Sequence, residues 1–158
     1  MTKKRLLIVD DKQTVRLLLA EILSLEGYAV DLAEHGKHAL QMLRRNSYDL
    51  IITDVNMPEM DGISFYRAIK EELPELKDRV LFLTGNPTDE AISFFKENSC
   101  KYMAKPFNGL DLLEQIEDII KRAGRKSKVH PVRSITKVLM SIQNLLIPIV
   151  GLSNGVHL

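Results

Sequence analysis

Five short apolar runs alternate along this chain with five segments of helical periodicity, and this alternation limits the possible folds more than any other feature. The apolar runs are predicted strands at Arg5–Val9, Ala29–Ala33, Tyr48–Thr53, Val80–Thr84 and Lys101–Ala104. Helical spacing of apolar residues follows each run, over residues 15–25, 36–45, 62–73, 88–98 and 109–122. Short apolar strands separated by helices are typical of a parallel sheet covered on both faces. The expected fold is therefore a doubly wound α/β domain with a five-stranded parallel sheet and five helices.

Glycine, proline and aspartate mark several predicted helix ends. Gly27 is expected just past the end of the first helix, where glycine adopts a left-handed conformation at low cost. Pro74 is expected to stop the helix after Gly62, because proline cannot continue the helical hydrogen bonds. The pair Asp61-Gly62 is typical of a turn at a helix start. Asp11 is a candidate N-cap of the first helix, since aspartate is favourable there.

A shift in charge divides the chain at Ala123-Gly124. Residues 1–123 hold 17 Lys and Arg against 21 Asp and Glu, whereas residues 124–158 hold five basic residues and no acidic one. Such a change in composition is typical of a domain boundary. We therefore expect one domain over residues 1–123 and a basic, apolar C-terminal tail over residues 124–158.

The tail contains an apolar stripe that predicts an amphipathic helix over residues 134–147, ended by Pro148. The stripe consists of Ile135, Val138, Ile142, Leu145 and Ile149. It is too short for an autonomous coiled coil and needs other cover. The sequence leaves open the body of this chain, a second copy, a partner helix, a membrane surface, or a tail without fixed structure. The tail has no helix-turn-helix pattern, so no DNA-binding output domain and no nucleic-acid partner are expected.

The composition favours a cytoplasmic protein. Cys100 is the single cysteine, so the chain cannot form an internal disulfide. The apolar run before Asp10 is too short for a signal peptide or a membrane span.

Chemically active side chains stand where predicted strands end. Asp10 and Asp11 follow the first strand, Asp54 the third, Thr84 ends the fourth and Lys105 follows the fifth. In an open α/β sheet, ligands bind at the carboxyl ends of the strands. Clustered carboxylates repel one another unless a cation joins them, and hard oxygen ligands suit Mg²⁺, with Mn²⁺ as an alternative. The cluster therefore predicts a metal site.

A carboxylate beside a divalent ion and an ammonium can act as a nucleophile toward phosphorus, which gives an aspartyl-phosphate. Asp54 is the best nucleophile candidate, because it stands alone after a central strand. Lys105 and Thr84 are expected to bind phosphoryl oxygens, and Asp10 and Asp11 to hold the metal. The residue after Thr84, Gly85, leaves room at the phosphate, and its N–H is a candidate donor to the third oxygen.

Four motifs at these strand ends resemble the receiver domain of two-component response regulators, including the stand-alone chemotaxis type. They are Leu-Leu-Ile-Val-Asp-Asp (6–11), Ile-Ile-Thr-Asp-Val-Asn-Met-Pro-Glu-Met-Asp-Gly (51–62), Phe-Leu-Thr-Gly (82–85) and Lys-Tyr-Met-Ala-Lys-Pro-Phe (101–107). The resemblance covers residues 4–123. It implies a flavodoxin-like fold with strand order 2-1-3-4-5.

The resemblance also implies the roles of individual residues. Asp54 would accept a phosphoryl group from a sensor histidine kinase or a phosphotransfer protein. Mg²⁺ would be held by Asp11, Asp54 and the backbone carbonyl of Asn56, with Asp10 acting mostly through water. Thr84 and Tyr102 would form a switch, and the Lys105-Pro106 bond would frequently be cis.

The same resemblance implies a signalling domain and not an enzyme, with slow self-dephosphorylation. The switch would change the surface of the fourth and fifth strands. An output partner would bind the face formed by the fourth helix, fifth strand and fifth helix. Dimerisation through the tail or a receiver face stays open.

The alternative function is an aspartyl-phosphate phosphatase or phosphotransferase. The haloacid-dehalogenase pattern requires a second Asp two residues after the nucleophile, whereas Asp10 and Asp11 are adjacent and Lys12 follows. A nucleotide-binding module is also disfavoured, since the first strand is not followed by a Gly-rich loop. Packing in the sheet is the alternative role for Tyr102.

Overall fold

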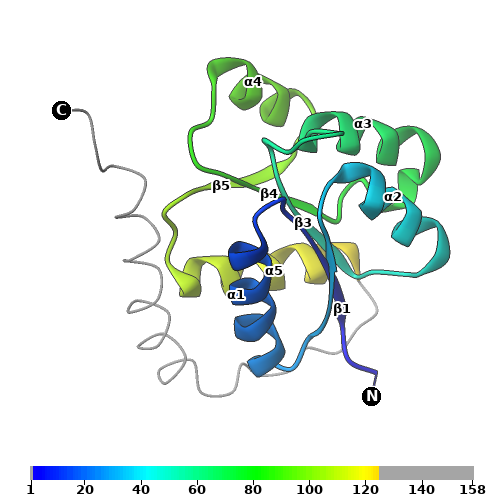
Figure 1. Ribbon diagram of the computed structural model, residues 1–158, viewed down its shortest axis with the longest axis vertical. Helices are drawn as coiled ribbons and strands as arrows, with labels where there is room; N and C mark the ends of the chain where they lie inside the picture. Colours follow the sequence, from blue (N-terminus) through cyan, green and yellow to red (C-terminus); the bar gives the residue numbers. More distant parts are fainter. Residues whose placement is uncertain (1, 125–158) are drawn as a thin grey trace.

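The computed structural model describes residues 2–124, which form a five-stranded sheet flanked by helices (Figure 1). The strands are β1 (Arg5–Val9), β2 (Ala29–Ala33), β3 (Leu50–Asp54), β4 (Val80–Thr84) and β5 (Lys101–Ala104). The helices are α1 (Gln13–Leu25), α2 (Gly36–Arg45), α3 (Gly62–Glu72), α4 (Asp89–Glu97) and α5 (Gly109–Ala123), with a short 3₁₀ helix at Pro74–Leu76. All strand pairs are parallel, in the order β2-β1-β3-β4-β5. The predicted fold class and strand order are confirmed.

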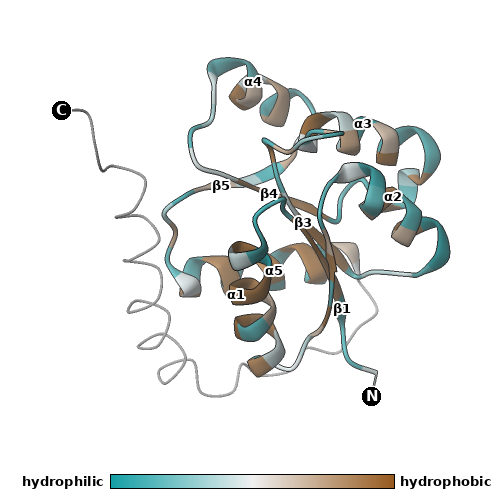
Figure 2. Cartoon of the chain, in the orientation of Figure 1, coloured by the Kyte–Doolittle hydropathy of each residue, from teal (hydrophilic) through white to brown (hydrophobic). Residues whose placement is uncertain are grey.

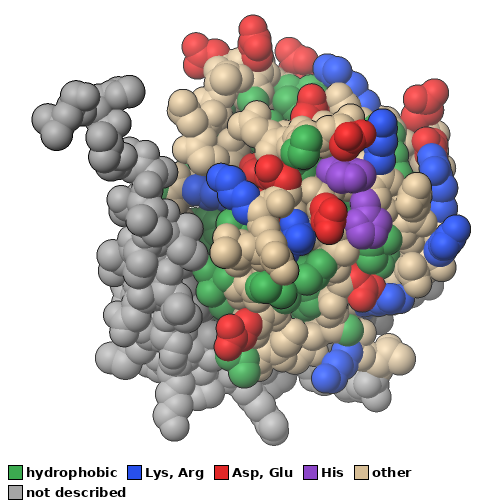
Figure 3. Space-filling view, viewed as in Figure 1, with side chains coloured by type: hydrophobic (Ala, Val, Ile, Leu, Met, Phe, Trp, Pro, Cys, Tyr) green, Lys and Arg blue, Asp and Glu red, His purple; other side chains and the backbone are tan. Residues whose placement is uncertain are grey.

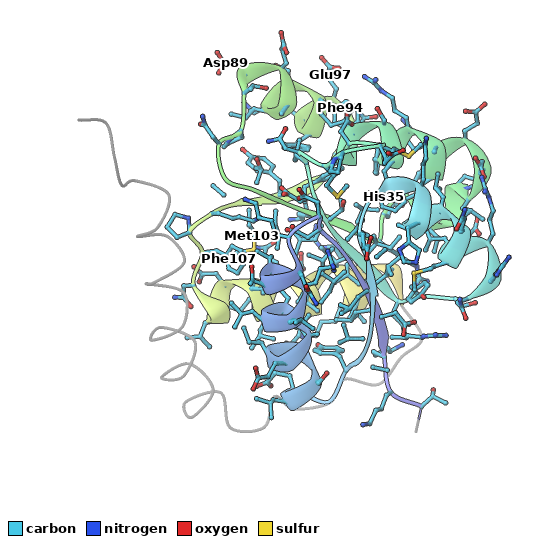
Figure 4. The ribbon with its side chains drawn as sticks, in the orientation of Figure 1. His35, Asp89, Phe94, Glu97, Met103 and Phe107 are labelled. Atoms are coloured by element: carbon cyan, nitrogen blue, oxygen red, sulfur yellow. The ribbon has the colours of Figure 1, made fainter. Side chains whose placement is uncertain are left out.

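Two apolar cores lie on opposite faces of the sheet, because successive strand residues point to opposite sides. Leu6 and Ile8 of β1 pack with α1 and α5, whereas Leu7 and Val9 pack with α2, α3 and α4. Figure 2 shows the resulting apolar interior and the polar outer faces of the helices. Met103 and Phe107, labelled in Figure 4, belong to the α1 and α5 side. Both faces of the sheet are therefore covered, as the apolar strands predict.

Helix α1 ends at a Schellman motif built on Gly27. Gly27 has a φ of 89°, its N–H donates to the carbonyl of Ser24 at 3.0 Å, and the N–H of Tyr28 donates to the carbonyl of Leu23 at 3.1 Å. This confirms Gly27 as the residue past the helix end. The N-cap alternative for Asp11 is wrong, because Lys12 occupies the N-cap position and no side chain caps it.

Strand β3 begins and ends later than predicted, at Leu50–Asp54 instead of 48–53. Just before the strand, the carboxylate of Asp49 accepts a hydrogen bond from the N–H of Arg5 at 2.8 Å, and the N–H of Asp49 donates to the carbonyl of Arg5 at 2.8 Å. Pairing with β1 starts at Leu50, and pairing with β4 continues through Asp54. The nucleophile candidate is thus the last residue of the strand and is fixed by the sheet itself.

Side-chain caps fix the other helix starts near the site. Asp61 accepts a hydrogen bond from the N–H of Ser64 at 2.7 Å, which confirms the predicted helix start. Helix α3 ends at Glu72, and the 3₁₀ helix starting at Pro74 follows. Thr88 caps α4, so that helix spans 89–97 and not 88–98.

Within 2–124, no helix has the length and apolar character needed to cross a bilayer. The predicted tail helix at 134–147 lies outside the described residues.

Candidate functional site

The predicted site residues lie at the carboxyl ends of adjacent strands. Asp10 follows β1, Asp54 and Thr84 end β3 and β4, and Lys105 follows β5. Strand β1 pairs with β2 on one side and with β3 on the other, so the direction of winding reverses there. This is the switch point at which open α/β sheets bind ligands.

Three carboxylates meet at this point. Asp10, Asp11 and Asp54 each place one carboxylate oxygen within 4.8 Å of the others. Asp10 and Asp54 are buried, with 3% and 8% of their surfaces exposed, and Asp11 is exposed. The site therefore combines two buried acids with one that faces solvent.

Backbone donors orient the two buried acids. The N–H of Lys12 donates to Oδ1 of Asp10 at 2.8 Å, and the N–H of Val55 donates to Oδ1 of Asp54 at 2.8 Å. These bonds use one oxygen of each carboxylate. The other oxygens, both Oδ2, are the atoms that approach Lys105.

Lys105 brings a positive charge to the two buried acids. Its Nζ lies 3.4 Å from Oδ2 of Asp10 and 3.8 Å from Oδ2 of Asp54. Its backbone N–H donates to the carbonyl of Thr84 at 2.7 Å, which ties the loop after β5 to the end of β4. The Lys105-Pro106 peptide bond is cis.

The electrostatics of the cluster leave an unbalanced negative charge. Burial raises the pKa of Asp54, and the neighbouring charges of Asp10 and Asp11 raise it further. The ammonium of Lys105 and the N–H of Val55 lower the pKa but do not reverse the shift. A divalent cation would offset the repulsion, and carboxylate oxygens are the ligands that Mg²⁺ prefers. The residues present therefore fit a magnesium ion.

Thr84 offers a hydroxyl without a partner. The side chain is 1% exposed, and Oγ1 makes no hydrogen bond to the described part of the chain. Buried polar atoms normally find a partner, so an unpaired hydroxyl beside the carboxylates indicates a place for a polar ligand atom. Thr53, one position before Asp54 in β3, is also fully buried, but its Oγ1 bonds to the Asp54 carbonyl at 2.9 Å.

The remaining predicted residues surround this centre. Asn56 is exposed in the loop after β3, and it lines a groove of about 350 Å³ together with Thr84. Gly85 is exposed, and a Cβ added there would meet open space. Tyr102 is 37% exposed and stacks on the buried ring of Phe95, with centroids 4.8 Å apart.

Two residues that support the site were not predicted from the sequence. A Cβ at Gly62 would overlap the carbonyl oxygen of Asp54, so a larger residue would push on the backbone of Asp54. The buried guanidinium of Arg16 donates to the backbone carbonyl of Asp10 at 2.7 Å. The sequence signal for Arg16 was the presence of an arginine among the apolar positions of the first helix.

Comparison with known proteins identifies the family. Residues 6–117 match the response regulator receiver domain. The chain belongs to this family. A receiver domain is a phosphoacceptor signalling module of two-component systems, so the resemblance seen in the four motifs is confirmed. The acidic cluster of Asp10, Asp11 and Asp54 lies inside the matched segment.

The curated relatives include a protein that the match covers almost completely and a longer protein that it covers in part. The response regulator receiver protein CpdR of Brucella abortus is 34% identical over 123 residues, which cover 74% of this chain and 97% of CpdR. The transcriptional regulatory protein RprY of Bacteroides fragilis is 32% identical over 149 residues, 93% of this chain. The receiver chain spans 62% of the length of RprY.

A solved structure shares both the fold and the sequence. The response regulator TrrA from Thermotoga maritima, in complex with Mg²⁺-BeF, is 34% identical with a TM-score of 0.64. The match covers 73% of this chain and 98% of TrrA.

Proposed function

We propose that this receiver accepts a phosphoryl group on the carboxylate of Asp54, in a Mg²⁺-dependent reaction. The donor is a phosphohistidine on a sensor histidine kinase or a phosphotransfer protein. One observation carries the proposal: three carboxylates lie within 4.8 Å of one another, with the Lys105 ammonium 3.4 and 3.8 Å from the two buried ones. This arrangement supplies a nucleophile, metal ligands and a countercharge at the end of one sheet.

The metal would be held by Asp11, Asp54 and the backbone carbonyl of Asn56, with Asp10 acting mostly through water. When bound, Mg²⁺ neutralises charge on the carboxylates and on the phosphoryl oxygens. Mn²⁺ has the same ligand preference and would substitute. The solved Mg²⁺-BeF complex of TrrA supports this assignment by similarity.

In the transfer step, a free oxygen of the Asp54 carboxylate forms a bond to phosphorus while the P–N bond of the phosphohistidine breaks. The histidine leaves as a neutral imidazole when its other nitrogen carries a proton, so no further proton donor is needed. Lys105 stabilises the negative charge on the phosphoryl oxygens. Thr84 Oγ1 and the N–H of Gly85 are the further donors.

We assign the response to Thr84 and Tyr102. The unpaired hydroxyl of Thr84 gains a partner when a phosphoryl group is bound, which draws the end of β4 toward Asp54. Tyr102 pairs with Phe82 of β4, and its partly exposed ring stacks on Phe95 of α4, so a movement of β4 would reach the ring through these two contacts. The change would alter the surface of β4 and β5, and an output partner would bind the α4-β5-α5 face.

The test is intact mass spectrometry after incubation with acetyl phosphate and Mg²⁺. We expect one added phosphoryl group, mapped to the peptide that contains Asp54, and slow loss of the group on standing. Asp54→Asn should abolish the adduct, whereas the matched control Asp78→Asn, at an exposed aspartate, should retain it. An adduct at normal yield in Asp54→Asn contradicts the proposal. Turnover of a generic phosphate ester would instead identify the enzyme alternative.

A further inference from the structure

The carboxylate of Asp11 lacks the contacts that fix the other two acids of the cluster. Those two are held by the N–H groups of Lys12 and Val55 and by the ammonium of Lys105. Asp11 is exposed, and its carboxylate forms no hydrogen bond or salt bridge with another residue in 2–124. Its place in the cluster therefore depends on the backbone that carries it.

The side chain of Arg16, in α1, holds that backbone. Nη1 of Arg16 donates to the carbonyl oxygen of Asp10 at 2.7 Å, and the arginine side chain is 11% exposed. This carbonyl belongs to the peptide unit that joins Asp10 to Asp11. Because a peptide unit is planar, a bond that fixes its oxygen also fixes the direction to the Cα of Asp11. The hydrogen bond therefore orients the acid that has no other support.

The end of β2 and the loop after it complete this support. The N–H of Asp10 donates to the carbonyl of Ala33 at 3.2 Å, and Nη2 of Arg16 lies 4.0 Å from Oε1 of Glu34. Figure 3 shows acidic and basic side chains close together near the histidines, on the side of the molecule where His35 follows this loop. A planar guanidinium can direct one nitrogen at the carbonyl and the other at the acid, whereas the ammonium of a lysine is a single point of charge.

The guanidinium would act on a bound metal ion in two opposite ways. As a cation beside the acidic cluster, it repels Mg²⁺. As the partner of the Asp10 carbonyl, it holds Asp11 in place, and the loss of such a supporting hydrogen bond typically weakens metal binding about 10–100-fold. The change in Mg²⁺ affinity on removal of Arg16 therefore has opposite signs for the two effects.

We propose that Arg16 is a positioning residue for the metal site, acting through the peptide unit between Asp10 and Asp11. It holds Asp11 where its carboxylate meets those of Asp10 and Asp54, so that Mg²⁺ binds a site that is already formed. This positioning outweighs the repulsion between the guanidinium and the ion. The inference rests on the metal ligands of the proposed function, but on no step of phosphoryl transfer.

The test is an NMR titration of Mg²⁺ into the ¹⁵N-labelled full chain, without a phosphoryl donor. Arg16→Met should bind Mg²⁺ about tenfold more weakly than the wild type, or more weakly still. Arg16→Lys keeps a donor for the carbonyl and should have an intermediate affinity. Arg122→Met is the matched control, because it removes an exposed arginine in the last turn of α5, and it should bind Mg²⁺ like the wild type.

The same spectra show whether each variant is folded. If Arg16→Met is unfolded, all proteins are titrated again with trimethylamine N-oxide, which favours the folded state because it is excluded from the protein surface. The affinities are then compared among folded proteins in one buffer.

Phosphorylation by acetyl phosphate gives a second measurement. In Arg16→Met, the Mg²⁺ concentration that gives half of the maximal rate should rise by the same factor as the dissociation constant. The rate at saturating Mg²⁺ should stay close to that of the wild type, because Arg16 does not contact the reacting atoms.

Three results would overturn the proposal. An unchanged Mg²⁺ affinity in Arg16→Met would leave Arg16 with a structural role alone, and a tighter affinity would show that its charge dominates. A lower rate at saturating Mg²⁺ with the same half-saturation would place Arg16 in the chemical step. A wild type that binds no Mg²⁺ would refute the metal site and this inference with it, whereas a wild type that binds Mg²⁺ but is not phosphorylated would contradict the proposed function alone.

Discussion

The side-chain nitrogen of Lys105 lies 3.8 Å from Oδ2 of Asp54, across the end of the sheet between β5 and β3. Both groups are largely buried, so their attraction is screened less than that of a surface pair. Burial raises the pKa of Asp54, and the charge of Lys105 lowers it. The ammonium would also compete with a metal ion for the same acids.

Removal of the Lys105 charge should therefore separate metal binding from phosphorylation. Lys105→Met is expected to bind Mg²⁺ at least as tightly as the wild type, since one competing cation is lost. Phosphorylation by acetyl phosphate should be roughly tenfold slower or more, because a charged hydrogen bond contributes about 1.5–3 kcal/mol. Lys101→Met, at the other end of β5, is the matched control and should react normally. A wild-type rate for Lys105→Met would contradict the assigned role.

Magnesium should stabilise the fold, because the carboxylates converge in the native state alone. At a concentration ten times its Kd, the ion adds about 1.4 kcal/mol to the free energy of unfolding. Thermal melts with and without Mg²⁺ should show a rise in Tm of several degrees for the wild type and a much smaller rise for Asp11→Asn. A shift in Asp11→Asn equal to that of the wild type would exclude Asp11 as a ligand.

The raised pKa of Asp54 predicts a pH-dependent stability in the absence of divalent ions. The folded state binds a proton more readily than the unfolded chain, so stability falls as the pH rises from the ordinary value of 3.8 through the raised value. Asp54→Asn removes this titration and should be more stable than the wild type near neutral pH. Urea unfolding in the presence of a chelator measures the free energy of unfolding of both proteins. The difference between Asp54→Asn and the wild type should become smaller as the pH is lowered. A difference that does not change with pH would contradict the raised pKa of Asp54.

Two buried threonines on neighbouring strands should respond in opposite directions to the same substitution. Thr84→Val replaces an unpaired hydroxyl with a methyl group and should leave stability unchanged or raise it by about 1 kcal/mol. Thr53→Val removes the bond to the Asp54 carbonyl and should lower stability by about 1–2 kcal/mol. Urea denaturation of both variants measures the difference. A loss for Thr84→Val as large as that for Thr53→Val would show that the Thr84 hydroxyl is already paired.

Much of the fold was predictable because the three central strands β1, β3 and β4 are buried on both faces and therefore appear as apolar runs, whereas the edge strands β2 and β5 are only partly buried. The end of β3 was placed one residue early, since Asp54 is polar and hydropathy does not register its pairing with β4. The N-cap role of Asp11 was wrong for a related reason. The propensity of aspartate for helix starts does not reveal that Lys12 takes that position.

The strand-end residues of the site were accessible from sequence because a parallel sheet brings its carboxyl ends together. Gly62 and Arg16 were not, since their roles depend on tertiary contacts with the backbones of Asp54 and Asp10. The Asp61-Gly62 pair was correctly interpreted as the start of a helix. No local pattern shows that the glycine also lies against the carbonyl of Asp54.

A crystal structure of the protein with Mg²⁺ and beryllium fluoride, a stand-in for the phosphoryl group, would test the central claim most directly. We expect beryllium on a carboxylate oxygen of Asp54 and Mg²⁺ on Asp11 and Asp54. The fluorides should accept hydrogen bonds from Lys105 Nζ and Thr84 Oγ1. Beryllium bound to another carboxylate, or a complex in which Lys105 and Thr84 make no contact with it, would contradict the account.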